Sequence, residues 1–341
     1  MQTELSPTWL RIPPEEMNVI FFEVLLRCGF SHKDADTCSR VFTESSIDGV
    51  YTHGVNRFPR FVQYVRDGYV KPQTRAVRKN SAGNIEQWDG QSGAGPVNAL
   101  ICTDRALEIA SEQGLGCVAL ANTNHWLRGG TYGWRAAKAG FVFIGWTNTI
   151  ANMPAWGAVD SKLGNNPMVI GIPYRSEAIV LDMAMSQYSY GAMELYAMKN
   201  EKLPVPGGYT EDGRLTDDPT AIQQSKRTLP VGYWKGAGLS LLLDILAAAL
   251  SGGLSTAAIT AQRTEYNLSQ VFIALDLSKL QNFKSIPVLI DNIIDDYHRS
   301  RTESGYKKIQ YPGERVLLTR KENSAMGIPV LRTVWDEILT L

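Results

Sequence analysis

The middle of the chain, residues 81–280, alternates short apolar runs with longer stretches of helical periodicity. Short apolar runs bounded by turn residues are typical of buried strands, and the longer amphipathic stretches are typical of helices. Alternation of the two kinds predicts an α/β region. Strands are expected at 85–88, 116–121, 141–146, 167–172, 178–183 and 271–277, and helices at 97–113, 131–139 and 235–250.

Both flanks of this region have a helical pattern instead. Pro13-Pro14-Glu15-Glu16 fits a helix start, because proline suits the first turn and acids favour the positive end of the helix dipole. Ser31, followed three residues later by Asp34, resembles a capping box in which aspartate replaces the usual glutamate. The pattern becomes helical again near residue 285. We therefore expect a helical domain, residues 1–80 plus 285–341, with an α/β domain, residues 81–284, inserted in it.

The segment 201–230 differs from its surroundings, because it is polar and rich in glycine and proline. So long a loop is unusual inside a compact domain and is often functional. We interpret it as a long loop or excursion, and as a possible arm that reaches a second subunit. A loop that covers its own cleft is the alternative.

Composition adds limits on the partners of the chain. Its 341 residues are 44% hydrophobic, and 34 basic residues balance 34 acidic ones, which argues against nucleic acid or an anionic membrane as partner. Its longest apolar run, 236–250, is interrupted by Asp244 and is expected to be too short to span a bilayer. The N-terminus lacks the basic and apolar regions of a signal peptide, and four cysteines without paired spacing suit a reducing compartment, so a cytoplasmic location is expected.

The segment 51–61 contains the most informative pair of side chains, His53 and Arg57. The chain has only 4 histidines, and a histidine exchanges a proton near neutral pH. An arginine four residues away can hold a carboxylate with two hydrogen bonds. The pair suits a small anionic 2-hydroxy or 2-oxo acid, whereas the alternative is an ordinary solvated helix face.

A second histidine, His125, lies in the segment 122–134, directly after the predicted strand 116–121. Loops between strand and helix are where ligands usually bind in α/β proteins. Two tryptophans and an arginine accompany this histidine, as expected for the wall of a pocket. The alternative is a core histidine that hydrogen-bonds a backbone carbonyl.

Two glycine-rich strings were compared with the dinucleotide fingerprint, which needs a strand before it and a helix after it. The string 114–119 matches in letters, but a helix precedes it and a strand follows. The string 93–98 has a better context but ends in Asn98. We therefore expect no Rossmann βαβ unit. The chain also lacks metal-ligand spacing and a nucleophile-elbow motif, so no metal site is predicted.

The two histidine segments, with further motifs in the same order and spacing, resemble the malate/L-lactate dehydrogenase family of non-Rossmann NAD(P)-dependent oxidoreductases. The resemblance covers residues 16–341 and is closest to the branch that acts on 2,3-diketo sugar acids. The further motifs are Ile85-Glu86-Gln87-Trp88-Asp89, Gly145-Trp146-Thr147-Asn148, Pro154-Ala155-Trp156-Gly157, Gly164-Asn165-Asn166-Pro167, Val180-Leu181-Asp182-Met183-Ala184-Met185-Ser186 and Gly232-Tyr233-Trp234-Lys235-Gly236.

The resemblance implies a mixed-sheet cofactor domain inserted in a helical domain, and a homodimer whose active site lies close to the subunit boundary. It implies NADH, or else NADPH, as cofactor. His53 is the first choice as catalytic acid/base and His125 the second. Arg57 is expected to hold the substrate carboxylate, and Asn148 or Thr149 are positional candidates for polarising the reacting carbonyl. Cofactor-binding positions carried over from the family pattern are Ala178, Ile179, Val180, Leu181, Asp182, Met183, Ala184, Trp234, Lys235, Gly313, Glu314 and Arg315.

The implied reaction is reversible reduction of a 2-oxo or 2,3-diketo sugar acid, 2,3-diketo-L-gulonate to 3-dehydro-L-gulonate. A malate, lactate or ureidoglycolate dehydrogenase is the alternative within the family. A histidine-dependent hydrolase or lyase, which needs no dinucleotide, and a non-enzymatic binding protein are alternatives from other classes.

Overall fold

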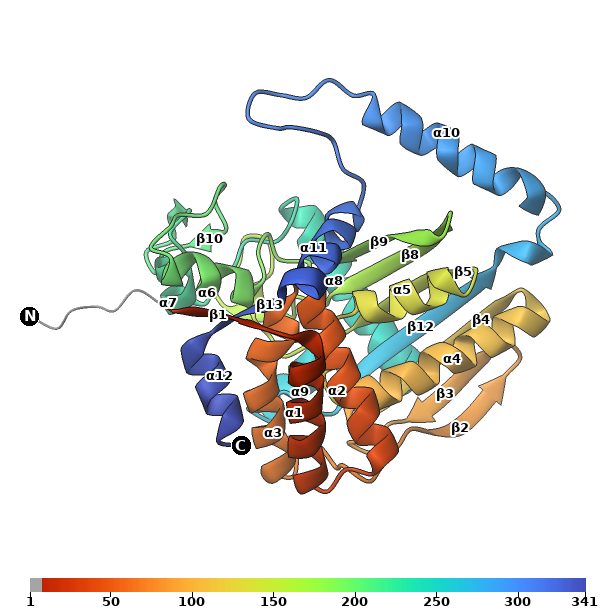
Figure 1. Cartoon of the computed structure of the whole chain (residues 1–341), viewed down its shortest axis with the longest axis horizontal. Helices are drawn as coiled ribbons and strands as arrows, with labels where there is room; N and C mark the ends of the chain where they lie inside the picture. The colour runs from red at the N-terminus through yellow and green to blue at the C-terminus, as the bar shows by residue number, and fades with distance from the viewer. Residues whose placement is uncertain (1–7) are drawn as a thin grey trace, which may run out of the picture.

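The structure is a computed structural model that describes residues 8–341, so the first seven residues lie outside the following account. The two ends of the chain meet, because β1 (Trp9–Ile12) pairs antiparallel with β13 (Ile328–Leu331). Figure 1 shows this two-stranded sheet beside the first helices. A helical unit is thereby built from both termini, as predicted.

An aromatic cluster holds the helical unit together. Phe21, Phe42 and Phe58 are fully buried, and the rings of Phe21 and Phe58 stack with centroids 4.0 Å apart. The second helix begins as predicted, because the Asp34 amide donates to Ser31 Oγ over 3.2 Å. The carboxylate of Asp34 pairs with an arginine, Arg75, so only half of a capping box forms. The helices here are α1 (Pro14–Arg27), α2 (His32–Ile47), α3 (Phe58–Arg66), α11 (Glu314–Met326) and α12 (Arg332–Leu339).

A seven-stranded mixed sheet forms the centre of the molecule, in the order β2-β3-β4-β12-β5-β8-β9. Only β3 and β4 run parallel; every other neighbouring pair is antiparallel. Each predicted strand is present, and β2 adds an edge strand that the sequence reading had placed in the helical domain. The strands are β2 (Val77–Ala82), β3 (Ile85–Asp89), β4 (Leu115–Thr123), β5 (Phe141–Thr147), β8 (Met168–Tyr174), β9 (Glu177–Met183) and β12 (Leu268–Asp276).

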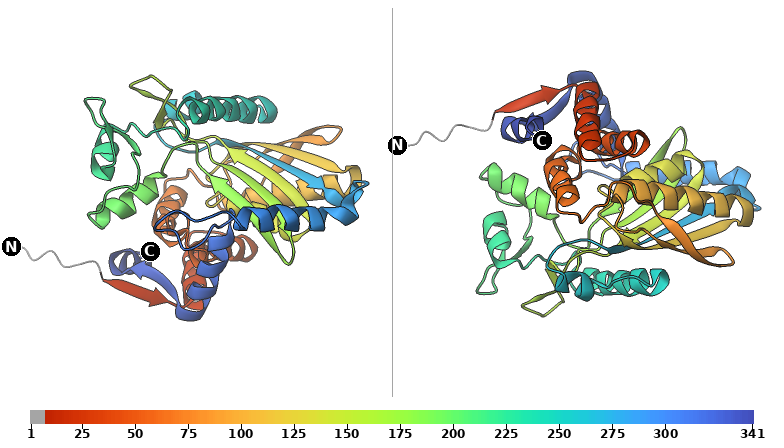
Figure 2. Two further views of the ribbon diagram at one scale, coloured as in Figure 1. Left: turned by 90° about the horizontal axis from the view of Figure 1, so that it is seen from above. Right: turned by 90° about the horizontal axis from the view of Figure 1, so that it is seen from below.

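Helices cover the two faces of the sheet (Figure 2). On one face, α4 (Gly95–Gln113) and α5 (Gly130–Lys138) pack on a core that contains Phe143 and Phe272. On the other face lies α8 (Trp234–Ser251). The mixed α/β architecture predicted from the sequence is confirmed.

The strands β3 and β4, with α4 between them, form one parallel βαβ unit, but the rest of the sheet is antiparallel and the fold is not a Rossmann fold. The unit does not offer a phosphate site at the start of its helix. A Cβ placed on Gly95 would lie 2.1 Å from the carbonyl oxygen of His125, so the loop after β4 already packs against this helix start.

The segment 201–230 is not the loop or arm that its composition suggested. It contains two short paired strands and a helix, and with α6 it closes a small core of Met193, Leu203 and Ile222. The projecting element is instead α10 (Ile286–His298), which stands away from the body in Figure 1. The elements of this subdomain are α6 (Tyr190–Met198), β10 (Gly208–Tyr209), β11 (Leu215–Thr216) and α7 (Pro219–Ser225).

The helix α8 is long and apolar enough, by length and composition alone, to cross a membrane. This length differs from the prediction for the run 236–250, and core helices of globular proteins pass the same test. Leu243 and Ala247 pack on the sheet, whereas Leu242 and Ile245 on the opposite side are exposed. The shorter elements are η1 (Tyr51–His53), η2 (Val55–Arg57), β6 (Met153–Pro154), β7 (Ser161–Leu163), α9 (Thr256–Ala261), η3 (Leu277–Lys279) and η4 (Phe283–Ser285).

Candidate active site

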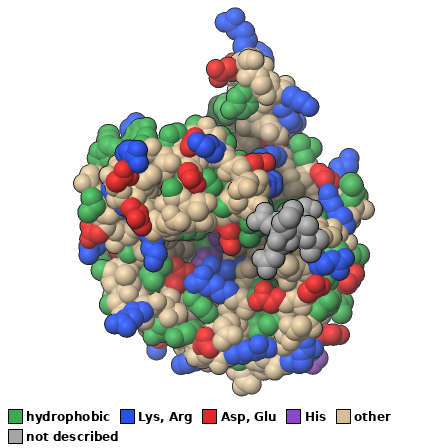
Figure 3. All heavy atoms as spheres, turned by 90° about the vertical axis from the view of Figure 1, so that its left-hand side faces the viewer, with side chains coloured by type: hydrophobic (Ala, Val, Ile, Leu, Met, Phe, Trp, Pro, Cys, Tyr) green, Lys and Arg blue, Asp and Glu red, His purple; other side chains and the backbone are tan. Residues whose placement is uncertain are grey.

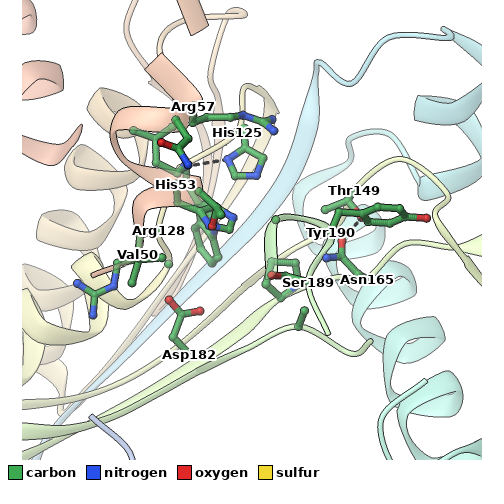
Figure 4. A pocket seen from close by; sticks show the side chains of 18 of the residues that line it. Val50, His53, Arg57, His125, Arg128, Thr149, Asn165, Asp182, Ser189 and Tyr190 are labelled. Carbon is green, nitrogen blue, oxygen red and sulfur yellow. Dashed lines mark hydrogen bonds between the residues drawn. The ribbon is translucent and has the colours of Figure 1, made fainter. Parts of the chain in front are cut away.

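A cavity of about 770 Å³ brings the two histidine segments together. Figure 4 shows His53, Arg57, His125 and Arg128 on one side of it and Thr149, Asn165, Ser189 and Tyr190 on the other. A space-filling view of one face also shows a hollow in which basic and histidine side chains are visible (Figure 3). The lining comes from the segments 50–60, 125–129, 149–152, 165–167, 180–184, 189–194 and 312–316, together with Glu265.

A tight turn positions His53 and Arg57. They end two consecutive 3₁₀ turns, η1 and η2, and do not share one α-helix as their spacing suggested. Gly54 separates the turns, and a Cβ there would lie 2.2 Å from Ser46 Oγ. That hydroxyl accepts a hydrogen bond from the amide of Val55 over 2.8 Å, so the turn is fixed on α2.

The two histidine rings face each other, with centroids 5.5 Å apart and planes inclined by 27°. The amide of Leu127 donates to Nδ1 of His125 over 3.0 Å. A neutral His125 therefore carries its proton on Nε2, where it serves as a hydrogen-bond donor. The hydroxyl oxygen of Thr52 lies 3.2 Å from Nδ1 of His53. Both rings are partly open to the cavity.

The surroundings keep both rings neutral in the free protein at neutral pH. Burial, with Arg57 and Arg128 nearby, lowers the pKa of His53 to about 4. Burial, with Arg57, His53 and Arg60 nearby, lowers the pKa of His125 well below its ordinary value. An anion that offsets the charge of Arg57 would raise the pKa of His53, because one cause of its depression would be removed.

Arg57 already has a partner. Its guanidinium lies 3.5 Å from Glu265 Oε1, and the other oxygen of Glu265 accepts from the Ile150 amide over 3.3 Å. Burial lowers the pKa of Arg57 and Glu265 opposes this, but an arginine stays charged in either case. A substrate carboxylate must therefore share Arg57 with Glu265. Arg60, one turn further on, also lines the cavity and was not singled out in the sequence.

Arg128 lies behind the histidines and is almost fully buried. It pairs with Asp48, which also accepts from Arg320 Nε over 2.6 Å. Burial raises the pKa of Asp48, but the two arginines outweigh it and the net shift is downward. Arg128 Nε has no hydrogen-bond partner among residues 8–341. Its charge helps to depress the pKa of His53, a role that its place in the loop segment did not reveal.

One wall of the cavity is the edge strand β9 with the turn before α11. The amide of Val180 donates to the Pro312 carbonyl over 3.0 Å. Gly313 has φ of 94°, and a Cβ on it would lie 3.2 Å from both the nitrogen and the oxygen of Val180. The Gly130 amide donates to Asp182 Oδ2 over 2.7 Å. Of the predicted cofactor positions, those that line the cavity are Val180, Leu181, Asp182, Ala184 and Gly313.

The side chain of Asp182 borders the cavity, and protein atoms surround its carboxylate on the other sides. Burial raises the pKa of its carboxyl group, and Arg128 and the Gly130 amide oppose that shift. The missing side chain of Gly313 lets the turn before α11 pack directly on Val180. Asp182 adds a carboxylate able to accept from ribose hydroxyls, so this wall fits an extended nucleotide. Among residues 8–341 no group of histidine, cysteine and acidic side chains has the geometry of a metal site.

The other predicted cofactor positions lie outside the cavity. Trp234 and Lys235 start α8 and are exposed. Glu314 is bound by Lys308 Nζ over 2.7 Å and by His298 Nε2 over 3.0 Å. The cavity lining does not include Arg315, Ala178, Ile179 or Met183 either.

Asn148 does not support the role proposed for it. Its side-chain nitrogen donates to Asp244 over 2.9 Å and to the Leu254 carbonyl, and its oxygen accepts from the Ser269 amide. The side chain is fully buried and ties the sheet to α8, so we withdraw it as a substrate ligand. Thr149, the other candidate, lines the cavity.

A cavity with two facing histidines and several arginines, on a mixed sheet, suits the acid–base chemistry of a hydroxy-acid dehydrogenase. The chain belongs to the malate/L-lactate dehydrogenase family, whose profile matches residues 12–339. The family expected from the sequence is confirmed, and with it the class of oxidoreductases that act on a CH–OH group.

Among its relatives, the chain is 42% identical over 333 residues to the 2,3-diketo-L-gulonate reductase of Citrobacter koseri, covering 97% of this chain and 100% of that protein. It is 40% identical, with the same coverage, to the 2,3-diketo-L-gulonate reductase of Klebsiella pneumoniae. Two solved structures share its fold. The sulfolactate dehydrogenase of Methanocaldococcus jannaschii has a TM-score of 0.88 at 25% identity, covering 96% of this chain and 95% of that one. The malate dehydrogenase of Entamoeba histolytica has a TM-score of 0.92 at 22% identity, covering 98% and 97%.

Proposed function

We propose that this protein reduces the 2-oxo group of an anionic sugar acid with a nicotinamide dinucleotide, converting 2,3-diketo-L-gulonate to 3-dehydro-L-gulonate. The observation that carries the proposal is the pair His53 and His125, whose rings face each other beside Arg57 in one cavity. The names of the relatives at 40–42% identity support the choice of substrate.

The bound nicotinamide supplies the hydride, with NADH as the proposed cofactor and NADPH as the alternative. Asp182 would hold the nucleotide at the β9 wall, and Gly313 lets the turn before α11 pack closely against that wall. Trp234 and Lys235 lie outside the cavity of one chain, so they would reach the far end of the nucleotide or serve a neighbouring subunit.

The protein supplies binding and one proton. Arg57 holds the substrate carboxylate, which offsets the positive charge that keeps the pKa of His53 low. The raised pKa lets His53 donate a proton to the developing alkoxide. His125, neutral and protonated on Nε2, donates a hydrogen bond to the same oxygen.

We further propose a cytoplasmic homodimer. The outer face of α8 exposes Leu242 by 56% and Ile245 by 51%, and the projecting α10 exposes Val288 by 61% and Ile293 by 57%. Contiguous apolar surface of this kind marks protein interfaces. A second copy would cover these faces.

A substrate panel tests the proposal. Oxidation of NADH and of NADPH is followed by absorbance with 2,3-diketo-L-gulonate, pyruvate, oxaloacetate and sulfopyruvate as substrates. We expect the highest kcat/KM with the diketo acid. Higher kcat/KM with oxaloacetate would assign the protein to malate instead, and no oxidation with any acid would contradict a reductase.

A further inference from the structure

The wall opposite the histidines is polar and has no role in the chemistry described above. Figure 4 shows Asn165, Ser189 and Tyr190 on this side, facing the cavity from the α6 region and the loop before β8. Asn152 and Glu194 line the same wall. We call these five residues the α6 wall.

Several polar atoms of the α6 wall have unused hydrogen-bonding capacity. The Oδ1 atom of Asn152 is buried and has no partner among residues 8–341, although its Nδ2 donates to Asn165 Oδ1 over 3.0 Å. Ser189 Oγ accepts from the Ala192 amide over 3.1 Å, which leaves its hydroxyl proton to donate. A buried unpaired acceptor is costly, so a donor from a ligand would stabilise it.

Glu194 is the charged member of the α6 wall. It lies four residues after Tyr190 and so on the same face of α6. No salt bridge or hydrogen bond engages its carboxylate among the described residues, and it is exposed. A neighbouring cavity of about 490 Å³ shares Asn152, Tyr190 and Glu194 with the first one, so polar space continues beyond Tyr190.

Charge sets the direction in which an anionic substrate lies. The arginines Arg57, Arg60 and Arg128 line the cavity from the segments that carry the histidines. The α6 wall contributes one carboxylate and no arginine or lysine to that lining. A substrate carboxylate therefore belongs on the histidine side, and the rest of the substrate extends toward Glu194.

We propose that the α6 wall binds the hydroxyl groups of an extended sugar acid and selects it over shorter or doubly acidic 2-oxo acids. Glu194 accepts hydrogen bonds from two neighbouring hydroxyls, and the Ser189 hydroxyl donates to a third. This inference rests on the proposed reductase function and names the structural basis of its substrate choice.

The proposal explains selection against the two alternative substrate kinds. A three-carbon acid held at Arg57 leaves the polar atoms of the α6 wall without partners from the substrate. A dicarboxylate brings its second charge toward Glu194, which repels it. Among the described residues that line the neighbouring cavity, Lys226 is the one cation, and it does not line the first cavity.

The test measures the ratio of kcat/KM for 2,3-diketo-L-gulonate to kcat/KM for pyruvate. We expect Glu194→Ala to lower this ratio about 10-fold or more, mostly through KM for the diketo acid, because hydrogen bonds to a charged group are lost. Glu194→Gln, which keeps an acceptor, should fall between. Glu201→Ala is the matched control, because Glu201 is exposed just after α6 and lines neither cavity.

An unchanged ratio in Glu194→Ala would overturn the proposal, as would equal losses with both acids, which would place Glu194 in the common machinery. A further arm uses oxaloacetate, for which Glu194→Gln should raise kcat/KM by removing the repulsion. Failure of the proposed function is distinguishable, because it shows in the unaltered enzyme, which would then oxidise neither NADH nor NADPH with these acids or would have a higher kcat/KM with oxaloacetate.

Discussion

At the scale of single residues, the proposed function gives the two histidines different tasks. His125 receives a backbone hydrogen bond on Nδ1, which fixes its tautomer, and its pKa is far below neutral. Nδ1 of His53 has a threonine hydroxyl beside it in place of a backbone amide, and its pKa is lowered by burial and by two arginines. Arginines also lower the pKa of His125, but its backbone hydrogen bond holds Nδ1 as an acceptor. His53 is therefore the group whose protonation responds to substrate, and His125 is the fixed donor.

Replacing His53 tests this division. We expect His53→Ala to lower turnover about 100-fold or more, the usual contribution of a general acid, with little change in NADH affinity measured by fluorescence titration. His125→Ala should also lower turnover, because it removes a donor to the alkoxide. Near-normal turnover in His53→Ala would assign the role of proton donor to His125 instead.

The pH profile of substrate reduction reports the same residue. Because the free enzyme holds the pKa of His53 at about 4, the protonated form becomes scarcer as pH rises, and kcat/KM for reduction should fall steadily through the neutral range. The profile of kcat should fall only at higher pH, since the bound carboxylate raises this pKa. Coinciding descending limbs for the two parameters would show that substrate does not tune His53.

Arg57 offers a test of anion binding. Lysine cannot form the paired hydrogen bonds of a guanidinium, and here it must also satisfy Glu265. We expect Arg57→Lys to raise KM about 10-fold or more in steady-state assays, while NADH affinity stays near that of the parent. A KM within about twofold would remove Arg57 from the carboxylate site.

At the scale of elements, strands and helices were predicted well because apolar runs buried between two helical layers show directly in sequence. His53 and Arg57 could be found in the sequence because they lie four residues apart in one segment. The α6 wall could not be predicted from the sequence, because its residues come from separate segments that only the tertiary structure brings together. The role of Asn148 was predicted wrongly, because the sequence after a strand does not show whether an asparagine side chain faces a cavity or hydrogen-bonds to α8.

The turn before α11 yields a prediction about the cofactor. Gly313 and Gly305 both have positive φ, but a Cβ would crowd Val180 only at Gly313 and would meet open space at Gly305. Gly313→Ala should therefore weaken NADH binding about 10-fold in calorimetric titration, whereas Gly305→Ala, which carries a similar backbone strain, should not. Equal NADH affinities for the two variants would show that this turn does not contribute to cofactor binding.

At the scale of the whole molecule, the proposed homodimer rests on the exposed apolar side chains of α8 and α10. The composition had suggested an arm at 201–230, but that segment buries its own core and α10 projects instead. Composition alone could not tell which segment lacks a partner, since that depends on what packs against each helix.

Light scattering during size exclusion, at micromolar concentration, tests the assembly. We expect a dimer mass for the parent and a shift toward monomer in Leu242→Glu or Ile293→Glu, because a buried unpaired charge opposes association. Met326→Glu is the control, an exposed apolar position on α11. A monomer mass for the fully active parent would contradict the homodimer.

The central claim is direct hydride delivery to the 2-oxo carbon of a sugar acid in the cavity between His53 and β9. It is tested most directly with reduced nicotinamide that carries deuterium at the transferring ring position, given to the enzyme together with 2,3-diketo-L-gulonate. The account predicts that mass spectrometry finds the deuterium on C2 of the product. Product without deuterium from either stereochemical label, or no product at all, would contradict it.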